Sequence, residues 1–242
     1  MHEFICFNQN IERAGDSFVS AVSSAALYGR GIFTTAAICG KKPFLWEKHW
    51  RRLKENADKL RIDLSAFSEE IIKTSLFELT EKNNFTDGRA RITFFDEAAG
   101  KIWNFPNSKQ PSFLITTADL REAEENFRVS ISPYSINSGS PLVNIKSCSY
   151  LENLLAHEEA QTRGFDEAIR INERGEIVSA CLANVFWLKN EELFTPPLAT
   201  GCLAGTMREF LSEKREVAEI AADLKVLESA DAIFLTSVGI GI

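Results

Sequence analysis

A polar, charged segment at residues 117–126, TADLREAEEN, separates two regions of the chain that are each rich in short strand-like runs. The runs before it include EFICFNQ, SFVSAVS, IFTTAAIC, PFLW and RARITFFDE, and those after it include FRVSIS, EAIRIN and NVFWLK. Because helix-like segments do not alternate strictly with these runs, the pattern favours an α+β fold. We expect two domains, 1–118 and a larger one at 127–242, joined by a linker at 119–126. Each is expected to be a mostly antiparallel or barrel-like sheet with packed helices.

Four segments carry helix signals. Apolar residues recur at helical spacing between residues 47 and 60, and Ser68 is a suitable N-cap for a second helix. In the second region, a strand-like run ending in Lys146 leads almost at once into a helix from about Ser149 to Arg163. A short helix is expected to begin after Gly205.

Composition limits the possible partners. The 242-residue chain has a formal net charge of -7, which argues against nucleic acid or an anionic membrane as the main partner, because both attract a basic surface. No stretch approaches the roughly 18 apolar residues of a membrane span, and the N-terminus lacks the features of a signal peptide. The five cysteines form no C-x-x-C pair, and the three histidines show no H-x-x-x-H spacing. We therefore expect reduced thiols, a cytoplasmic location and no metal site.

Lys146 stands where the strand-like run gives way to a helix. Most lysines at such positions are solvated surface residues. A partly desolvated lysine, in contrast, loses its proton more easily, so it can attack an aldehyde and later move protons. Position alone leaves both interpretations open.

Three other segments could bind an anion. Gly205 precedes an expected helix start at Thr206 and Met207, where free backbone N–H groups attract negative charge. Arg52 offers a guanidinium that can bind phosphate oxygens, and residues 236–239 offer a hydroxyl and loop amides. Each feature alone is more often an ordinary loop or surface residue.

Four stretches in this order carry a family resemblance: YGRGIFTTAAICGKKPFLWEKHWRRL, IKSCSYLENLLAHEEAQTRGFDEAIRIN, ANVFWLKNEELFTPPL and LAGTMREF. The chain resembles the class IV aminotransferase-type enzymes of fold-type IV, which use pyridoxal 5′-phosphate (PLP). Within that group, the FTT run is similar to the lyase that converts 4-amino-4-deoxychorismate into 4-aminobenzoate and pyruvate in folate biosynthesis. Branched-chain or D-amino-acid aminotransferase activity remains open, as does a cofactor-binding protein with little or no catalysis.

The resemblance implies roles for individual residues. Lys146 is expected to hold PLP as an internal aldimine, Leu203 to pack on the cofactor ring, and Thr35 to supply a catalytic hydroxyl. The cofactor phosphate is expected to be bound by Arg52, Thr206, Met207, Ser237 and Val238. Tyr150 or Ser149 is expected near the phenolic oxygen, and Arg30 and Arg91 are candidates for the substrate carboxylates. The resemblance also implies a homodimer.

One position departs from the family pattern. The family usually has a glutamate five residues before the asparagine of ANVF, and this chain has Ser179 there. That glutamate contacts the cofactor's ring nitrogen and strengthens its electron-withdrawing power. Glu176 lies three residues earlier, so on a strand it is expected to face the other way. We therefore expect Ser179 to disfavour transamination more than elimination.

Overall fold

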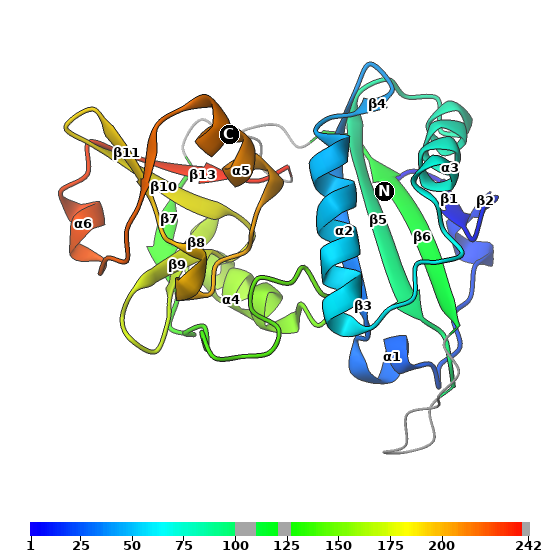
Figure 1. Ribbon diagram of the computed structural model, residues 1–242, viewed down its shortest axis with the longest axis horizontal. Helices are drawn as coiled ribbons and strands as arrows, with labels where there is room; N and C mark the ends of the chain where they lie inside the picture. Colours follow the sequence, from blue (N-terminus) through cyan, green and yellow to red (C-terminus); the bar gives the residue numbers. More distant parts are fainter. Residues whose placement is uncertain (100–109, 121–126, 239–242) are drawn as a thin grey trace. The chain divides into compact units, whose positions relative to one another are not determined.

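The computed structural model describes residues 1–99, 110–120 and 127–238 of the chain (Figure 1). Its contacts divide the chain into two units. Unit 1 comprises Met1–Leu120 together with Lys146–Ser149, and unit 2 comprises Arg121–Ile145 together with Tyr150–Ile242. The mixed α+β class with mainly antiparallel sheets is as expected from the sequence. No helix within the described ranges is long and apolar enough to cross a membrane.

Unit 1 is built on one six-stranded antiparallel sheet with the order β2-β1-β6-β5-β3-β4. Its strands are β1 (Phe4–Phe7), β2 (Asn10–Arg13), β3 (Gly31–Cys39), β4 (Lys42–Pro43), β5 (Gly88–Asp96) and β6 (Pro111–Ala118). Its helices are α1 (Ser24–Tyr28), α2 (Trp46–Leu60) and α3 (Glu69–Lys82), with a short 3-10 turn at Ala14–Asp16. Ser68 caps α3 as expected, because its Oγ accepts a hydrogen bond from the Ile71 N–H.

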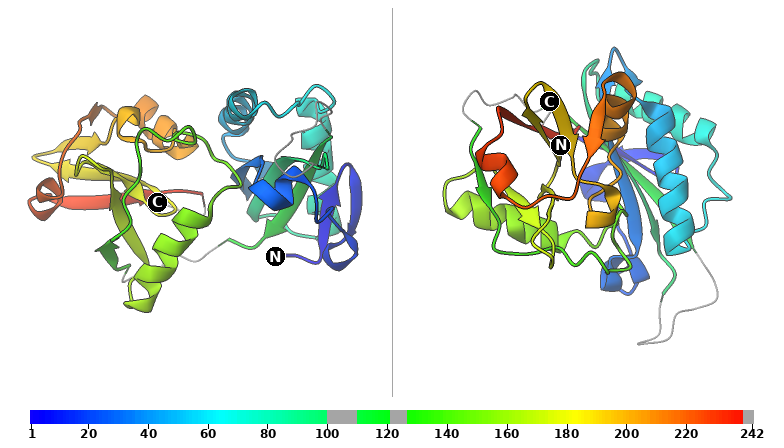
Figure 2. Two further views of the ribbon diagram at one scale, coloured as in Figure 1. Left: turned by 90° about the horizontal axis from the view of Figure 1, so that it is seen from below. Right: turned by 60° about the vertical axis from the view of Figure 1, so that its left-hand side comes forward.

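The two longer helices cover one face of this sheet (Figures 1 and 2). Alternate residues of β3, among them Ile32, Thr34 and Ala36, are fully buried beneath α2. Trp50 of α2 makes an edge contact with Phe94 of β5. Side chains alternate across a strand, so Phe33 and Thr35 lie on the opposite face of the sheet.

Unit 2 contains two smaller sheets. The first has the order β7-β8-β9, with β7 (Val129–Ile131), β8 (Glu167–Ile171) and β9 (Ile177–Ala180). The second has the order β12-β11-β10-β13, with β10 (Asn184–Lys189), β11 (Glu192–Thr195), β12 (Val217–Glu219) and β13 (Ala232–Thr236). The helices are α4 (Leu151–Thr162), α5 (Thr206–Lys214) and α6 (Lys225–Glu228), with a 3-10 turn at Leu198–Thr200. Ile169, Ile177 and Val185 form part of its core.

Three expected strands are absent at their positions. The run SFVSAVS contains no strand and leads into α1, which is capped by Ser23. The run PFLW contributes only Pro43 to β4, because α2 already begins at Trp46. The run before Lys146 forms a turn, with Asn144 at a φ of 61°. Such a left-handed residue does not fit an extended strand.

The segment carrying Lys146 packs with unit 1, whereas the sequence analysis placed it in the C-terminal domain. The reason is backbone pairing: the Phe33 N–H donates to the Lys146 carbonyl oxygen, and the Cys148 N–H donates to the Gly31 carbonyl oxygen. The run KIWNF, which the sequence pattern predicts to be a short strand, and most of the expected linker lie outside the described residues.

Candidate active site

Lys146 is fixed along the edge of β3. The two backbone hydrogen bonds on either side of Ser147 have N···O distances of 2.9 and 2.8 Å, and Ser147 forms a β-bridge with Ile32. The side chain of Lys146 extends over the ring of Phe33, with Nζ 4.6 Å from the ring centroid. The main chain therefore determines where this amine is presented.

The surroundings of Lys146 disfavour its charged form. The side chain is half-buried, and burial is the largest cause that lowers the pKa of its amine to about 7. The guanidinium groups of Arg52 and Arg91 lower this pKa further by repulsion. Near neutral pH a large fraction of the amine is therefore unprotonated, as a nucleophile or proton acceptor requires.

Arg91 lies on the same face of the sheet as Phe33 and Thr35. It is the register partner of Thr35 across β3 and β5, and its guanidinium carbon lies 3.7 Å from the centroid of the Phe33 ring. Its Nε donates to Thr93 Oγ1 at 3.2 Å, and it also interacts with the Cys148 thiol. The structure thus brings two of the expected site residues, Lys146 and Arg91, around one aromatic ring.

Arg52 projects from α2 and is almost fully buried. Its Nη2 donates to Thr34 Oγ1 at 2.7 Å, and the same oxygen lies 2.6 Å from Nδ1 of the buried His49. Burial, followed by repulsion from Arg52 and Lys146, lowers the pKa of His49 to about 3. His49 is therefore neutral, and positive charge in this part of unit 1 is carried by the guanidinium groups and by protonated Lys146.

The second group of expected site residues lies in unit 2, at the start of α5. Gly205 is the N-cap residue and makes no side-chain cap, while Thr206 and Met207 are buried. Asn184 Nδ2 donates to the Leu203 carbonyl oxygen at 2.8 Å. A Cβ atom at position 205 would lie 2.0 Å from Asn184 Oδ1, so only glycine fits there. The backbone N–H groups of this first turn form an electropositive helix end.

The end of β13 belongs to the same group. Asn184 is the register partner of Thr236, and Ser237 and Val238 follow directly. Asn184 also contacts the Leu203–Gly205 segment, so the C-terminal end of β13 and the N-terminal start of α5 lie around this one asparagine. No role for Asn184 was expected from the sequence.

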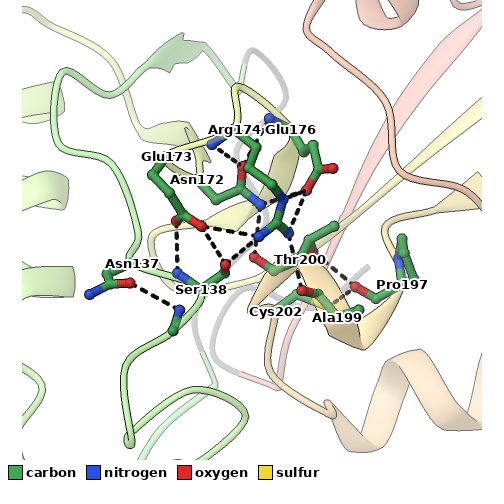
Figure 3. A network of polar contacts seen from close by, with 11 residues as sticks. Asn137, Ser138, Asn172, Glu173, Arg174, Glu176, Pro197, Ala199, Thr200 and Cys202 are labelled. Carbon is green, nitrogen blue, oxygen red and sulfur yellow. Dashed lines mark hydrogen bonds and ion pairs between the residues drawn. The ribbon is translucent and has the colours of Figure 1, made fainter.

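A polar network supports the loop that leads to Leu203 (Figure 3). The buried Asn172 donates to the Thr200 carbonyl oxygen at 3.2 Å, and Arg174 donates to that of Ala199 at 3.3 Å. Arg174 also donates to Ser138 Oγ at 2.6 Å, which ties in a third loop. Glu176 accepts from both Asn172 and Arg174, so its contacts belong to this network.

The remaining expected residues have these positions. Ser179 is half-buried in β9, as the register partner of Arg170. Arg30 forms an ion pair with Asp96, with an N···O distance of 3.7 Å, and donates to the Arg61 carbonyl oxygen. Ser149 Oγ donates to the backbone carbonyls of Tyr28 and Gly29. Arg30 is thus engaged by Asp96 and the Arg61 carbonyl, whereas Arg91 is exposed and contacts Phe33 and Thr93.

Comparisons with known proteins identify the family of this chain. The family model described as amino-transferase class IV matches residues 31–242. An aminodeoxychorismate lyase of Bacillus subtilis (strain 168) is 28% identical over 231 residues, covering 92% of this chain and 78% of the relative. The branched-chain-amino-acid aminotransferase of Escherichia coli (strain K12) is 26% identical over 251 residues, covering 97% and 81%.

Solved structures show the same fold. The crystal structure of the Escherichia coli branched-chain amino acid aminotransferase matches with a TM-score of 0.91 at 24% identity, covering 100% of this chain and 84% of that one. The corresponding enzyme of Thermobaculum terrenum, in its PLP form, matches with a TM-score of 0.85 at 20% identity, covering 99% and 83%. The chain belongs to the class IV aminotransferase family and is a PLP-dependent enzyme.

The described residues fit this cofactor. An amine with a pKa of about 7 suits covalent attachment of an aldehyde, and a buried guanidinium suits a phosphate group. In unit 2, the N-terminus of α5 follows Gly205, and the free backbone N–H groups of a helix N-terminus also suit a phosphate group. Four residues near these groups were not expected from the sequence: His49, Thr34, Asn184 and Asn172. Their residue types are common throughout proteins, so a role becomes visible only when the structure shows their hydrogen-bond partners.

Proposed function

We propose that this enzyme is a lyase that converts 4-amino-4-deoxychorismate into 4-aminobenzoate and pyruvate, a step of folate biosynthesis. One observation carries the proposal most strongly: Thr35, Arg91 and the amine of Lys146 are presented on one face of the unit 1 sheet. A weakly basic amine, a hydroxyl and a guanidinium are suited to a small anionic substrate. The 28% identical lyase of Bacillus subtilis supports the same reaction.

In this proposal the cofactor is held by Lys146 and Arg52, and by Leu203, Thr206, Met207, Ser237 and Val238. Bound PLP would supply electron withdrawal from the substrate carbon that carries the amine. Ser179 can donate a hydrogen bond but offers no negative charge, and it therefore favours elimination over transamination. Arg30 is a weaker candidate for substrate binding than Arg91, because Asp96 already engages it.

The protein groups divide the proton transfers between them. Lys146, with a pKa of about 7, accepts the proton from the substrate carbon that bears nitrogen. The carbon–oxygen bond to the enolpyruvyl group breaks as the six-membered ring becomes aromatic. Lys146 or the Thr35 hydroxyl then delivers a proton to the departing enolpyruvate, which leaves as pyruvate. Exposed Arg91 attracts the carboxylates of the substrate.

The test is product formation by the purified, PLP-loaded protein. We expect 4-aminobenzoate and pyruvate in equal amounts, no detectable turnover in Lys146→Ala, and a loss of about tenfold or more in kcat for Thr35→Val. Thr35→Ser, which keeps the hydroxyl, is the matched control and should retain most of the activity. Absence of both products from the wild-type protein would refute the lyase assignment.

A branched-chain or D-amino-acid aminotransferase is the second candidate, favoured by the Escherichia coli relative at 26% identity. It predicts that an amino acid and 2-oxoglutarate are consumed together. A PLP-binding protein with little catalysis predicts a cofactor absorbance band, lost in Lys146→Ala, without turnover in either assay.

We also propose a homodimer in the cytoplasm. The five cysteines are all free thiols, which suits a reducing compartment. Light scattering should then give twice the chain mass of 27.1 kDa. A mass of one chain at assay concentration would contradict the dimer.

A further inference from the structure

Thr34 stands between two side chains whose hydrogen-bonding roles are constrained. Its Oγ1 is 2.7 Å from Arg52 Nη2 and 2.6 Å from His49 Nδ1, and all three residues are buried. A guanidinium can only donate hydrogen bonds, so the Thr34 oxygen accepts from Arg52. The single hydroxyl hydrogen of Thr34 is then available for His49 Nδ1.

The lowered pKa of His49 keeps its ring neutral near pH 7, so the ring adds no second cation beside Arg52. The Thr34 hydroxyl has one hydrogen and two lone pairs, so it can accept from Arg52 and also form a hydrogen bond with His49 Nδ1 in which either atom is the donor.

The chain of bonds thus runs from His49 through Thr34 to Arg52. His49 and Arg52 lie three residues apart on α2, and Thr34 is contributed by β3. A hydroxyl restrains the guanidinium without adding charge, whereas a carboxylate at the same position would add a negative charge beside it.

We infer that Thr34 is a positioning residue, which orients Arg52 for an anionic group through an uncharged hydrogen bond beside a neutral His49. This inference rests on the proposed role of Arg52 in binding the cofactor phosphate. It goes further in assigning a function to Thr34, which does not contact the cofactor in this scheme.

The test compares two ligands that differ only in the phosphate, PLP and pyridoxal. Dissociation constants are measured by fluorescence titration for the wild type, Thr34→Val, Thr34→Ser and Arg52→Gln. Valine keeps the volume of threonine and removes the hydroxyl. We expect Thr34→Val to weaken PLP binding about tenfold and to leave pyridoxal binding unchanged, because only the phosphate interaction is lost. Thr34→Ser should retain the preference for PLP.

A double-mutant cycle separates positioning from general packing. In the Arg52→Gln background, Thr34→Val should have no further effect on PLP affinity, since its action passes through Arg52. Thr34→Glu should also weaken PLP binding. Its added charge should raise the pKa of Lys146, which Arg52, Arg91 and burial hold low.

Two results would overturn the inference: unchanged PLP affinity in Thr34→Val, or equal losses for PLP and pyridoxal. These outcomes leave the lyase assignment standing. If the wild type itself does not prefer PLP to pyridoxal, the inference fails together with the proposed role of Arg52 in binding phosphate.

Discussion

Burial and the guanidinium groups of Arg52 and Arg91 all lower the pKa of the Lys146 amine. Its pKa of about 7 means that deprotonation occurs in the neutral range, not near the usual value of 10.5. The half-buried position lets an aldehyde approach while limiting hydration of the ammonium form. The reactivity of this residue is therefore a property of its neighbours as much as of the lysine.

Arg91→Gln should raise the pKa of Lys146, because removing a nearby positive charge stabilises the ammonium form. The rate at which Lys146 is trapped by an aldehyde and a mild hydride donor should rise with pH through about 7 in the wild type. In Arg91→Gln the midpoint should move to higher pH. Peptide mapping by mass spectrometry identifies the modified lysine.

Arg89→Gln is the matched control for this experiment. Arg89 lies two residues earlier on the same strand and face, and its Nε donates to the Asp119 carbonyl oxygen. Its removal should leave the midpoint unchanged. An equal shift in both variants, or no shift in Arg91→Gln, would contradict the role assigned to Arg91.

Single residues differ in how far the sequence predicts them. Lys146, Arg52 and Arg91 were identified because their chemistry is distinctive and their flanking motifs resemble a family. Thr34 was not, because a β-branched residue in a strand is ordinary. Its role depends on His49 and Arg52 in a helix that begins 12 residues later, and no local pattern reports that contact.

Among the elements, the start of α5 is the most tightly constrained. Gly205→Ala would place a methyl group 2.0 Å from Asn184 Oδ1, and the amide is held by its bond to the Leu203 carbonyl. We expect a loss of about 1–3 kcal/mol in the free energy of unfolding, measured in urea, and weaker PLP binding. Either the Asn184 side chain or the backbone must shift to relieve this overlap, and either shift disturbs the loop and helix start that Asn184 holds.

The double variant Gly205→Ala/Asn184→Ala is the control. Removing the Asn184 side chain relieves the overlap, so the double variant should be less destabilised than the sum of the two single variants. Additive losses would show that the overlap with Asn184 is not the reason for glycine at this position.

Helices were easier to predict than strands. The periodicity of residues 47–60 and the Ser68 cap identified α2 and α3 to within a residue or two. The run before Lys146 is apolar enough for a strand, yet it contains Pro141 and Asn144, and the chain turns there. Turn formation at Asn144 depends on a backbone conformation that apolar patterning does not report.

For the whole molecule, the division into units follows the chain except at one place. The boundary after Leu120 falls within the segment expected as a linker. The packing of Lys146–Ser149 with unit 1 was not expected. It depends on backbone hydrogen bonds to the edge of β3, and the order of apolar and polar residues does not predict such bonds. The sequence pattern therefore does not reveal which unit contains the reactive lysine.

The lowered pKa of Lys146 also bears on the stability of the folded chain. Between pH 7 and 10.5 the unfolded chain binds more protons at this residue than the folded chain, so its contribution to stability rises with pH. We expect the cofactor-free Lys146→Met variant to be more stable than the wild type by about 1–3 kcal/mol at pH 6, allowing for partial exposure.

This difference should shrink as the pH rises to 10, because the folded wild type already has a neutral amine there and the unfolded chain is approaching its pKa of 10.5. Urea unfolding at pH 6, 8 and 10 provides the measurement, with Lys48→Met on the surface of α2 as the control. A stability difference between Lys146→Met and the wild type that does not change with pH would contradict the lowered pKa.

The inclusion of Lys146–Ser149 in unit 1 has a consequence for how the protein folds during its synthesis. A ribosome releases the first 120 residues well before these four, so the nascent sheet is made before the segment that bonds to the Gly31 carbonyl and the Phe33 amide. The amine that the chemistry needs arrives only with that segment. Completion of the N-terminal fold and arrival of its reactive group therefore coincide.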